Sequence, residues 1–458
     1  MNALIISAVL GVVMMFSGIL LENKAAVRNV AVGGMLLLLL ANILEMSGTV
    51  FFRIDTKGMI VFDHFALLIN SIVFASAFIY LVLSAKDMER VGINYAEYFA
   101  LIFFILCGIT LVTSFKSLLI LFLGIEIISI PLYILTGSDK RNLKGNEAAL
   151  KYFLLGSFST GLMLMGIAFF YGARGTFSTV SVPGAAVTAN SLLIAGMSLL
   201  LFSMAFKVSA APFHFWTPDV YDGAPTVFTS FMASIVKAAV FIAFIRLFDD
   251  AFDYMQPKWQ LWVAVITAVT LLVGNITAVF QQSVKRMLAY SSIAQAGFML
   301  LSLYAMNTEA KEGLLIYAAA YCLATIGIFA VLAKMSDYSF DGFNGFSKKE
   351  PVIAAALTVF LFSLAGIPLT AGFIAKFYML KAAITAPHSL WLVIFAVLMA
   401  AVSVYYYFRV IQAMYFKESN DVPPPVFTSF FRVALAVLAI LVILLGLVPG
   451  ILLKWLYF

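Results

Sequence analysis

The stretch Leu201–Phe241 reads LFSMAFKVSAAPFHFWTPDVYDGAPTVFTSFMASIVKAAVF and decides the fold. It is apolar, carries Lys207 and Lys237, and is interrupted by the prolines Pro212, Pro218 and Pro225. Proline lacks a backbone donor and clashes with the preceding helical turn, so a helix must break here. We expect a helix carrying Lys207, an irregular turn, a short piece ending near Tyr221, and a new helix with Lys237 near its middle. Inside a membrane, such breaks are tolerated only where protein or a water-filled cavity covers the freed backbone, and in transporters they mark ion sites.

The composition indicates a polytopic membrane protein. Of the 458 residues, 64% are hydrophobic and 11% charged, and the mean hydropathy is +1.06. A soluble globular protein is about 45–50% apolar and about 25% charged, so we expect the solvent of this chain to be a lipid bilayer. The net charge of +6 predicts no nucleic-acid partner, because the basic residues lie in short loops between apolar runs, as in cytoplasmic loops.

No cofactor motif is recognisable in the sequence. Cys107 and Cys322 lie inside apolar runs without a CxxC pattern, and the histidines His64, His214 and His388 are scattered. There is no G-x-G-x-x-G and no P-loop. We therefore expect this chain to hold no metal and no redox cofactor of its own.

Apolar runs of spanning length recur along the whole chain. A membrane-spanning helix needs about 20 apolar residues, which gives about 14 segments here. The expected segments are 3–21, 25–44, 61–84, 96–113, 117–135, 148–172, 191–211 with a broken continuation to 221, 225–248, 259–280, 286–306, 312–334, 352–382, 388–416 and 428–454. The loops, such as 45–60, 173–190 and 335–350, are too short to fold separately. We expect one integral membrane domain over 1–458.

The basic residues predict the orientation. Loops after odd-numbered segments are richer in Lys and Arg, for example Lys140, Arg141 and Lys144, than loops after even-numbered ones. Such an excess marks the cytoplasmic side. Both termini are then expected on the opposite, periplasmic side of a bacterial inner membrane, which agrees with an even number of segments.

A second interrupted segment predicts an internal repeat. Leu361–Leu380 reads LFSLAGIPLTAGFIAKFYML, an apolar run broken by Gly and Pro that also carries one lysine, Lys376. Two interrupted segments in corresponding positions of two halves indicate an ion site between inverted repeats. We expect segments 4–8 (96–248) and 9–13 (259–416) to be the two repeats, with broken helices 7 and 12. A repeat of five spans ends on the opposite side of the membrane from its start, so the second repeat would be inverted relative to the first.

Four charged residues lie within the expected spans: Glu126, Lys207, Lys237 and Lys376. Each costs about 2.5–3.5 kcal/mol at a helix centre on insertion scales. Structural explanations stay open for them. A lysine near a helix end often extends to the interface, which fits Lys207 and Lys376 better than Lys237. Glu126 could form a purely structural ion pair with a lysine.

The sequence also suggests positions or roles for three further polar residues. Lys151, in NEAALKYFLL, is expected at the cytoplasmic end of its helix, and Arg246 is expected to be an interface anchor. His214 stands beside the break and either packs there or takes part in proton handling. We keep Lys151 and His214 as secondary site candidates.

The functional hypothesis uses one piece of chemistry. Desolvation lowers the pKa of a lysine, and a nearby carboxylate raises it again. A lysine that gains or loses a carboxylate neighbour can therefore bind and release a proton. Lys207, Lys237 and Lys376, bridged by water, would form a proton relay, with Glu126 controlling the first lysine.

The central motif resembles a known family. PFHFWTPDVYDGAPT, with Lys207 five residues before it and Lys237 after it, resembles the antiporter-like membrane subunits of respiratory complex I. The wording DVY-x-GAP is similar to subunit N rather than L or M. The segments GIEIISIPLYIL, EAALKYFLLGSFSTG, VKRMLAYSSIAQAGF and GIPLTAGFIAKFY support the resemblance, which covers roughly residues 60–415.

The resemblance implies a proton-pumping subunit of NADH–quinone oxidoreductase with 14 helices, inverted five-helix repeats and broken helices 7 and 12. The family's proton-handling residues would be Glu126, Lys207, Lys237 and Lys376, and a lysine at the last position fits N and L rather than M. Partner subunits of the membrane arm are implied. NAD, FMN, iron–sulfur clusters and quinone would belong to partner subunits.

Two alternatives remain at this point. One is a subunit of a multi-subunit cation/proton antiporter or of a membrane-bound hydrogenase, which share the lysines and broken helices. The other is a scaffold subunit whose buried charges are structural. The composition of the native complex distinguishes the first, and the effect of removing Lys237 on pumping distinguishes the second.

Overall fold

The computed structural model describes residues 1–21, 23–180, 190–387, 389–418 and 425–456. Residues 181–189 of the expected loop 173–190, and residue 388, where we expected the segment 388–416 to begin, lie outside these ranges. Within them the structure is helical, and the only β pairings are isolated bridges.

The described helices share an apolar composition and follow one another with short connections. They are α1 (Asn2–Leu20), α2 (Lys24–Met46), α3 (His64–Met88), α4 (Tyr95–Ser114), α5 (Leu118–Thr136), α6 (Leu143–Arg174), α7 (Ser191–Lys207), α8 (Trp216–Gly223), α9 (Thr226–Phe231), the π-helical turn η1 (Met232–Val236), α10 (Lys237–Phe252), the 3₁₀ turn η2 (Asp253–Met255), α11 (Gln256–Val279), α12 (Val284–Ala305), α13 (Thr308–Leu332), the 3₁₀ turn η3 (Asp341–Phe343), α14 (Phe346–Lys349), α15 (Pro351–Ala365), α16 (Ala371–Ile384), α17 (Leu390–Phe416), α18 (Ser429–Leu447), α19 (Gly450–Leu453) and the 3₁₀ turn η4 (Lys454–Leu456).

The lengths of these helices account for the expected membrane passes. Among the described residues, 11 helical runs are long and apolar enough to span a bilayer. One of them, Thr226–Val279, has 54 residues. It is about 80 Å long at 1.5 Å per residue, against about 30 Å of hydrocarbon core, and η2 separates it into two passes. The 11 runs then give 12 passes, because Thr226–Val279 counts as two. The two interrupted segments, α7 with α8 and α15 with α16, bring the number among the described residues to the expected 14. The predicted all-α, multi-pass membrane fold is confirmed.

Both predicted interruptions are present. The first follows α7 and runs through Ser209, with φ of +66°, and the cis peptide Ala211–Pro212 to the start of α8. The amide of Ala211 donates to Oγ1 of Thr270 at 2.9 Å, so this freed backbone group has a partner. The second interruption separates α15 from α16 and contains Gly366, with φ of +83°. It divides the expected segment 352–382 as its Gly and Pro residues predict.

The last pass is shorter than expected. We expected a helix over 428–454, but α18 ends at Leu447 and a separate short helix, α19, begins at Gly450. The cause is Pro449, which cannot donate to the preceding turn and so ends the helix.

The contacts divide the chain into two compact units. The first comprises Met1–Val208, Gly223–Pro225 and Ile235–Leu261, and the second comprises Ser209–Asp222, Thr226–Ser234 and Trp262–Phe458. The single membrane domain over 1–458 and the repeats over 96–248 and 259–416 stay predictions.

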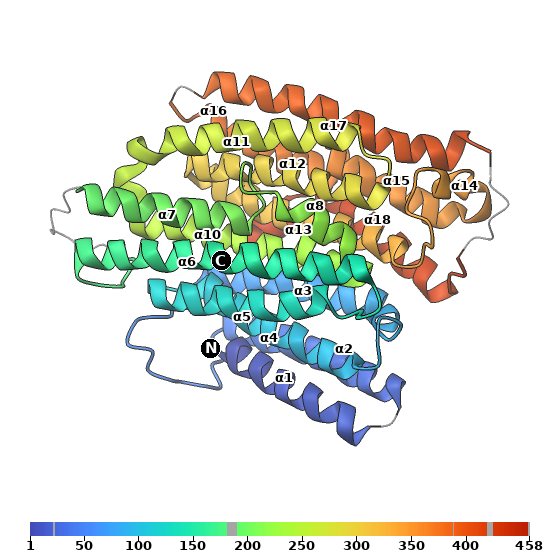
Figure 1. Cartoon of the computed structure of the whole chain (residues 1–458), viewed down its shortest axis with the longest axis horizontal. Helices are drawn as coiled ribbons and strands as arrows, with labels where there is room; N and C mark the ends of the chain where they lie inside the picture. Colours follow the sequence, from blue (N-terminus) through green and yellow to red (C-terminus); the bar gives the residue numbers. More distant parts are fainter. Residues whose placement is uncertain (22, 181–189, 388, 419–424, 457–458) are drawn as a thin grey trace. The chain divides into compact units, whose positions relative to one another are not determined.

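In the first unit, the helices that carry site residues pack closely. Helices α6 and α7 lie side by side (Figure 1). They approach closely at Gly166 and Gly196, where a Cβ on either residue would lie 3.0 Å from the carbonyl oxygen of the other. Small residues allow helix backbones to approach in this way in membranes. The approach brings the side chains of α6 within reach of the end of α7.

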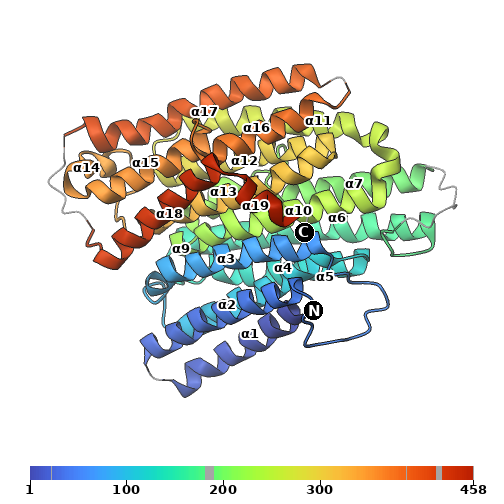
Figure 2. The same cartoon turned by 180° about the vertical axis from the view of Figure 1, so that it is seen from behind.

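In the second unit, α18 supports the second interruption. Helices α13, α15, α16 and α18 pack together (Figure 2). Gly446 of α18 faces the backbone of the interruption itself, with the carbonyl oxygen of Leu369 only 2.7 Å from the position of a Cβ on Gly446. The unusual backbone between α15 and α16 is therefore covered by protein, as a break at membrane depth requires.

The close approach of α6 and α7 yields a first prediction. Gly166→Leu should destabilise the protein by about 1–3 kcal/mol, because the added side chain enters a packed helix contact. Gly161→Leu, on the same helix, is the matched control, since a Cβ there meets nothing within 4 Å. Thermal unfolding of the detergent-solubilised protein measures both. Equal melting temperatures for the two variants would contradict the packing described here.

The second interruption yields another prediction. Gly366→Ala should destabilise the protein by at least about 1–2 kcal/mol, the cost of a left-handed backbone for an L-residue. Gly175→Ala is the control, because Gly175 also has a positive φ, of +67°, but open space around its Cβ. The loss should be larger at Gly366, where a Cβ would lie 2.8 Å from Cδ of Lys376. The same melting experiment compares them, and an equal loss would mean that the lysine contact has no energetic weight.

Candidate functional site

In the first unit, four polar side chains of α5, α6 and α7 form one cluster. Oε1 of Glu126 accepts a hydrogen bond from Oγ1 of Thr160 at 2.7 Å. Nζ of Lys207 donates to Oγ of Ser129 at 2.9 Å and makes a longer contact, 3.5 Å, to Oγ1 of Thr160. Among the described residues, no direct ion pair joins Glu126 and Lys207. The carboxylate and the ammonium group are connected through the threonine hydroxyl.

Local sequence explains why these groups meet. Glu126 and Ser129 are three residues apart on α5, and such pairs lie on one helical face. Lys207 is the last residue of α7, where cations are favoured by the helix dipole. The hydroxyls of Ser129 and Thr160 are buried, whereas Glu126 and Lys207 are partly exposed on the isolated chain. The sequence predicted that Glu126 is near the first lysine but did not predict the connecting hydroxyls.

Lys237 follows an irregularity that the sequence did not reveal. The turn η1 is π-helical, and Lys237 is the first residue of regular α-helix after it, with 2% of its surface exposed. Single π turns inside α-helices occur frequently at functional sites. The burial shows that the Lys237 side chain does not extend to the surface of the isolated chain, whereas its part in proton transfer stays a prediction.

In the second unit, Lys376 is bound by the interruption between α15 and α16. Its Nζ donates to the carbonyl oxygens of Leu364 and Ala365, each at 2.9 Å. These residues end α15, and the last carbonyls of a helix lack partners within it. Nζ also lies 4.5 Å from the centre of the Phe298 ring. With 6% of its surface exposed, Lys376 is buried and does not extend to an interface.

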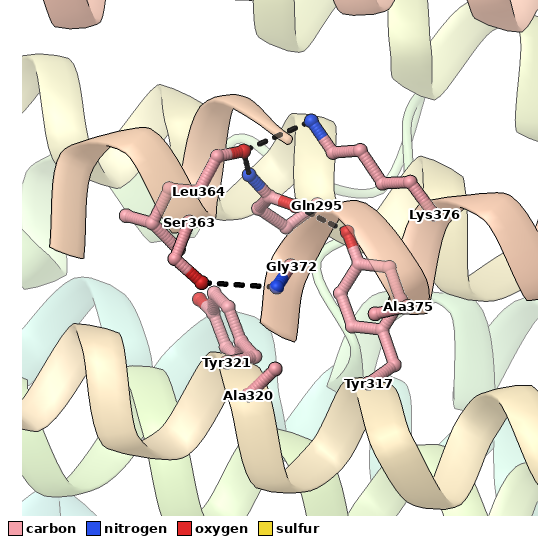
Figure 3. Close-up of a pocket in the computed structure, with 9 residues that line it drawn as sticks. All are labelled: Gln295, Tyr317, Ala320, Tyr321, Ser363, Leu364, Gly372, Ala375 and Lys376. Atoms are coloured by element: carbon pink, nitrogen blue, oxygen red, sulfur yellow. Dashed lines mark hydrogen bonds between the residues drawn. The ribbon is translucent and has the colours of Figure 1, made fainter. Parts of the chain in front are cut away.

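A network of neutral polar groups adjoins Lys376 (Figure 3). Nε2 of Gln295 donates to the same Leu364 carbonyl at 2.8 Å and to the hydroxyl of Tyr407 at 3.0 Å. Tyr317 donates to Oε1 of Gln295, and the hydroxyls of Ser291 and Tyr407 are hydrogen-bonded. Sequence reasoning did not single out the two tyrosines. The sequence did contain an indication of them, because a tyrosine hydroxyl buried within an apolar span needs a hydrogen-bond partner.

A cavity borders this network. It is small, with a volume of about 10 Å³, which is close to the space that one water molecule needs. It is lined by Gln295, Tyr317, Tyr321 and Lys376 together with residues of α13, α15 and α16. Figure 3 shows these side chains converging from different helices. Cavities with several polar partners are the ones that accommodate water.

The two secondary candidates lie apart from these clusters. Lys151 is paired with Glu147 at 2.7 Å, one helical turn earlier, and its side chain is 42% exposed. This exposure fits the expected interfacial position. His214 lies in the first interruption, is buried, and stacks on Phe215 with 4.7 Å between ring centroids. Its proposed part in proton handling stays a prediction.

One expectation about the charges was wrong. Arg246 is not an interface anchor, since only 7% of its side chain is exposed. It pairs with Asp63 at 2.6 Å and donates to the carbonyl oxygen of Thr113 at 2.8 Å. Lys116 and Asp250 join the same cluster through a 2.9 Å ion pair. These contacts make Arg246 part of the packing between α3, α4 and α10.

The acidic residues of the DVYDGAP motif have a structural role in the second unit. Asp219 and Asp222 of α8 face Arg286 of α12, at 3.2 Å and 3.8 Å. The carbonyl oxygen of Asp222 also accepts from Nζ of Lys285 at 3.0 Å. The motif thereby connects the short helix after the break to α12. Among the described residues, no group of three or more His, Cys, Asp or Glu could hold a metal ion.

Comparisons with known proteins agree on one family. Residues 116–403 match the family model described as NADH:quinone oxidoreductase/Mrp antiporter, TM. The NADH-quinone oxidoreductase subunit N of Cytophaga hutchinsonii is 40% identical over 461 residues, covering 99% of each protein. The subunit N of Trichlorobacter lovleyi is 41% identical over 402 residues, covering 86% of this chain and 82% of that one.

Solved structures give the same picture. A chain in the structure of respiratory complex I from Thermus thermophilus with bound aureothin is 33% identical, with a TM-score of 0.85 over 99% of this chain and 98% of that chain. A chain of the Mrp complex from a Dietzia species has a TM-score of 0.87 over 99% of this chain and 95% of that chain. At 18% identity, the second similarity shows a shared fold alone. The chain therefore belongs to the NADH:quinone oxidoreductase/Mrp antiporter family of membrane proteins.

Proposed function

We propose that this chain is the proton-translocating subunit N in the membrane arm of NADH–quinone oxidoreductase. The similarity to subunit N proteins over almost the full length of the chain favours this assignment over a multi-subunit antiporter or a hydrogenase. The redox reaction, with NAD, FMN, iron–sulfur clusters and quinone, would take place in partner subunits. The complex would reside in a bacterial inner membrane, with both termini of this chain on the periplasmic side.

The observation that supports translocation most strongly is the placement of the lysines at the two interruptions. Lys207 ends the half-helix before the first, and Lys376 binds the carbonyls that the second sets free. Ammonium groups within membrane spans are costly, and ionisable residues there generally mark ion or proton pathways. The hydroxyl contacts of Lys207 and the water-sized space beside Lys376 provide hydrogen-bonding partners for proton transfer.

In the proposed mechanism, the distance between Glu126 and Lys207 controls whether Lys207 holds its proton. A carboxylate near an amine stabilises its protonated form, and that stabilisation falls as the carboxylate withdraws or is neutralised. Glu126 would exert this control on Lys207, and the proton would pass onward by way of Lys237 and Lys376, with water between them. Conformational change driven by the redox reaction in partner subunits would move Glu126 relative to Lys207.

A lysine substitution tests the proposal. In the purified, reconstituted complex, Lys237→Met should lower NADH-driven proton pumping and coupled quinone reduction by about tenfold or more, since a positioned proton-transfer group contributes roughly 10²–10⁴-fold. Methionine keeps the apolar length of the side chain and removes its proton site. Pumping is followed with a pH-sensitive dye in proteoliposomes, and NADH oxidation is followed by absorbance.

The matched control is Lys258→Met, because Lys258 is the next lysine along the chain and is exposed at the start of α11. A normal number of protons per NADH in an assembled Lys237→Met complex would support the scaffold alternative and contradict the relay. Copurification of NADH-oxidising subunits with the native chain checks the assignment to this enzyme independently.

A further inference from the structure

We propose that the hydroxyl of Thr160 carries the proton between Lys207 and Glu126. This inference rests on the proposed function, because it assigns a step within the same relay. It goes beyond the residues that the sequence or the family resemblance suggested, since Thr160 was singled out by neither.

Thr160 occupies the position that a connecting group needs. Its Oγ1 lies 2.7 Å from Oε1 of Glu126 and 3.5 Å from Nζ of Lys207. The first distance is that of a good hydrogen bond, and the second is at its outer limit. Thr160 itself is buried, with 8% of its surface exposed, between two ions that are partly exposed on the isolated chain.

Lys207 has two alternative hydroxyl partners. In this structure its short bond goes to Ser129, at 2.9 Å, and the contact to Thr160 is longer. A small rotation of the long, flexible lysine side chain would shorten the second contact at the expense of the first. Ser129 and Thr160 thus define a resting position and a transfer position for the ammonium group.

The threonine proton also has two acceptors. Oγ1 donates to Glu126 and lies 3.1 Å from the carbonyl oxygen of Gly156, one turn earlier on α6. Both acceptors lie within reach of the same Oγ1 position, and a hydroxyl proton can turn about the Cβ–Oγ1 bond from one acceptor to the other. Rotation of the hydroxyl proton toward Gly156 would interrupt the connection to Glu126, and rotation back would restore it.

The transfer step balances without a further reactant. An N–H bond of the Lys207 ammonium breaks as its proton joins Oγ1 of Thr160. The O–H bond of Thr160 breaks at the same time, and that proton joins Oε1 of Glu126. The products are a neutral amine, an unchanged threonine and a neutral carboxylic acid, and the reverse transfer restores both charges.

The competing explanation is that Thr160 only holds α5, α6 and α7 together. The neighbouring residue provides the comparison for it. Ser159 makes hydrogen bonds of the same kind to α7, with 3.2 Å between its Oγ and Oγ of Ser203, but it contacts neither ion. A structural role would make the two residues equivalent, whereas a transfer role would not.

The experiment compares Thr160→Val, Thr160→Ser and Ser159→Ala in the purified complex, reconstituted in proteoliposomes. Valine keeps the shape of threonine without the hydroxyl, and serine keeps the hydroxyl without the methyl group. We expect Thr160→Val to lower the rate of coupled proton pumping by about tenfold or more. We expect Thr160→Ser and Ser159→Ala to pump at close to the unsubstituted rate, with equal assembly of all complexes on native gels.

Normal pumping by Thr160→Val would overturn the inference, and so would an equal loss in Thr160→Ser, which would indicate packing. Should Thr160→Val fail to assemble, Thr160→Ala carries the same test against the serine variant. The Lys237→Met complex separates the two levels of the argument. Lowered pumping in Lys237→Met with normal pumping in Thr160→Val removes the threonine step alone, and normal pumping in Lys237→Met removes the proposed function.

Discussion

The hydrogen bonds from Lys376 to the end of α15 are the interaction on which the second unit depends. An interrupted helix leaves carbonyl groups without partners, and a buried ammonium group lacks the water that would solvate it. Each alone would cost several kcal/mol in an apolar surrounding. Bonded together at 2.9 Å, they satisfy one another. The interruption and the lysine therefore explain each other, and Gly366 and Gly446 provide the space that both require.

The first unit solves the same problem with different chemistry. Lys207 is held by the hydroxyls of Ser129 and Thr160 rather than by backbone carbonyls. A carbonyl at a helix end is a fixed dipole that can only accept, whereas a hydroxyl both donates and accepts and can rotate. The hydrogen bonds of the first lysine site can therefore be rearranged by rotation of its hydroxyl partners, which the carbonyl partners of the second site do not allow. This difference fits a carboxylate placed beside the first site.

Much of this arrangement could be predicted from the sequence because it depends on local properties. Hydropathy and length identified the spans, and proline and glycine located both interruptions. The cost of a buried charge identified Glu126, Lys237 and Lys376 as residues of interest. The π turn before Lys237 could not be predicted, since no proline or glycine marks it in MASIV. Its backbone depends on packing against other helices.

The contacts between helices were also beyond sequence reasoning. Whether Glu126 meets Lys207 directly or through Thr160 depends on how α5, α6 and α7 pack against one another, which the sequence of no single helix shows. The expectation that Arg246 is an interface anchor was wrong because it, too, depends on contacts between helices. Its partner Asp63 lies 183 residues earlier in the chain, so the sequence around Arg246 does not reveal the pair.

The most direct test of the account is a high-resolution cryo-electron microscopy map of the assembled complex in a lipid nanodisc. We expect density for the Lys376 ammonium group within hydrogen-bonding distance of the Leu364 and Ala365 carbonyls, with ordered water in the adjoining cavity and no opening to bulk solvent at the amine. A Lys376 side chain that instead extends to either membrane surface, with the end of α15 bonded to other groups, would contradict the account.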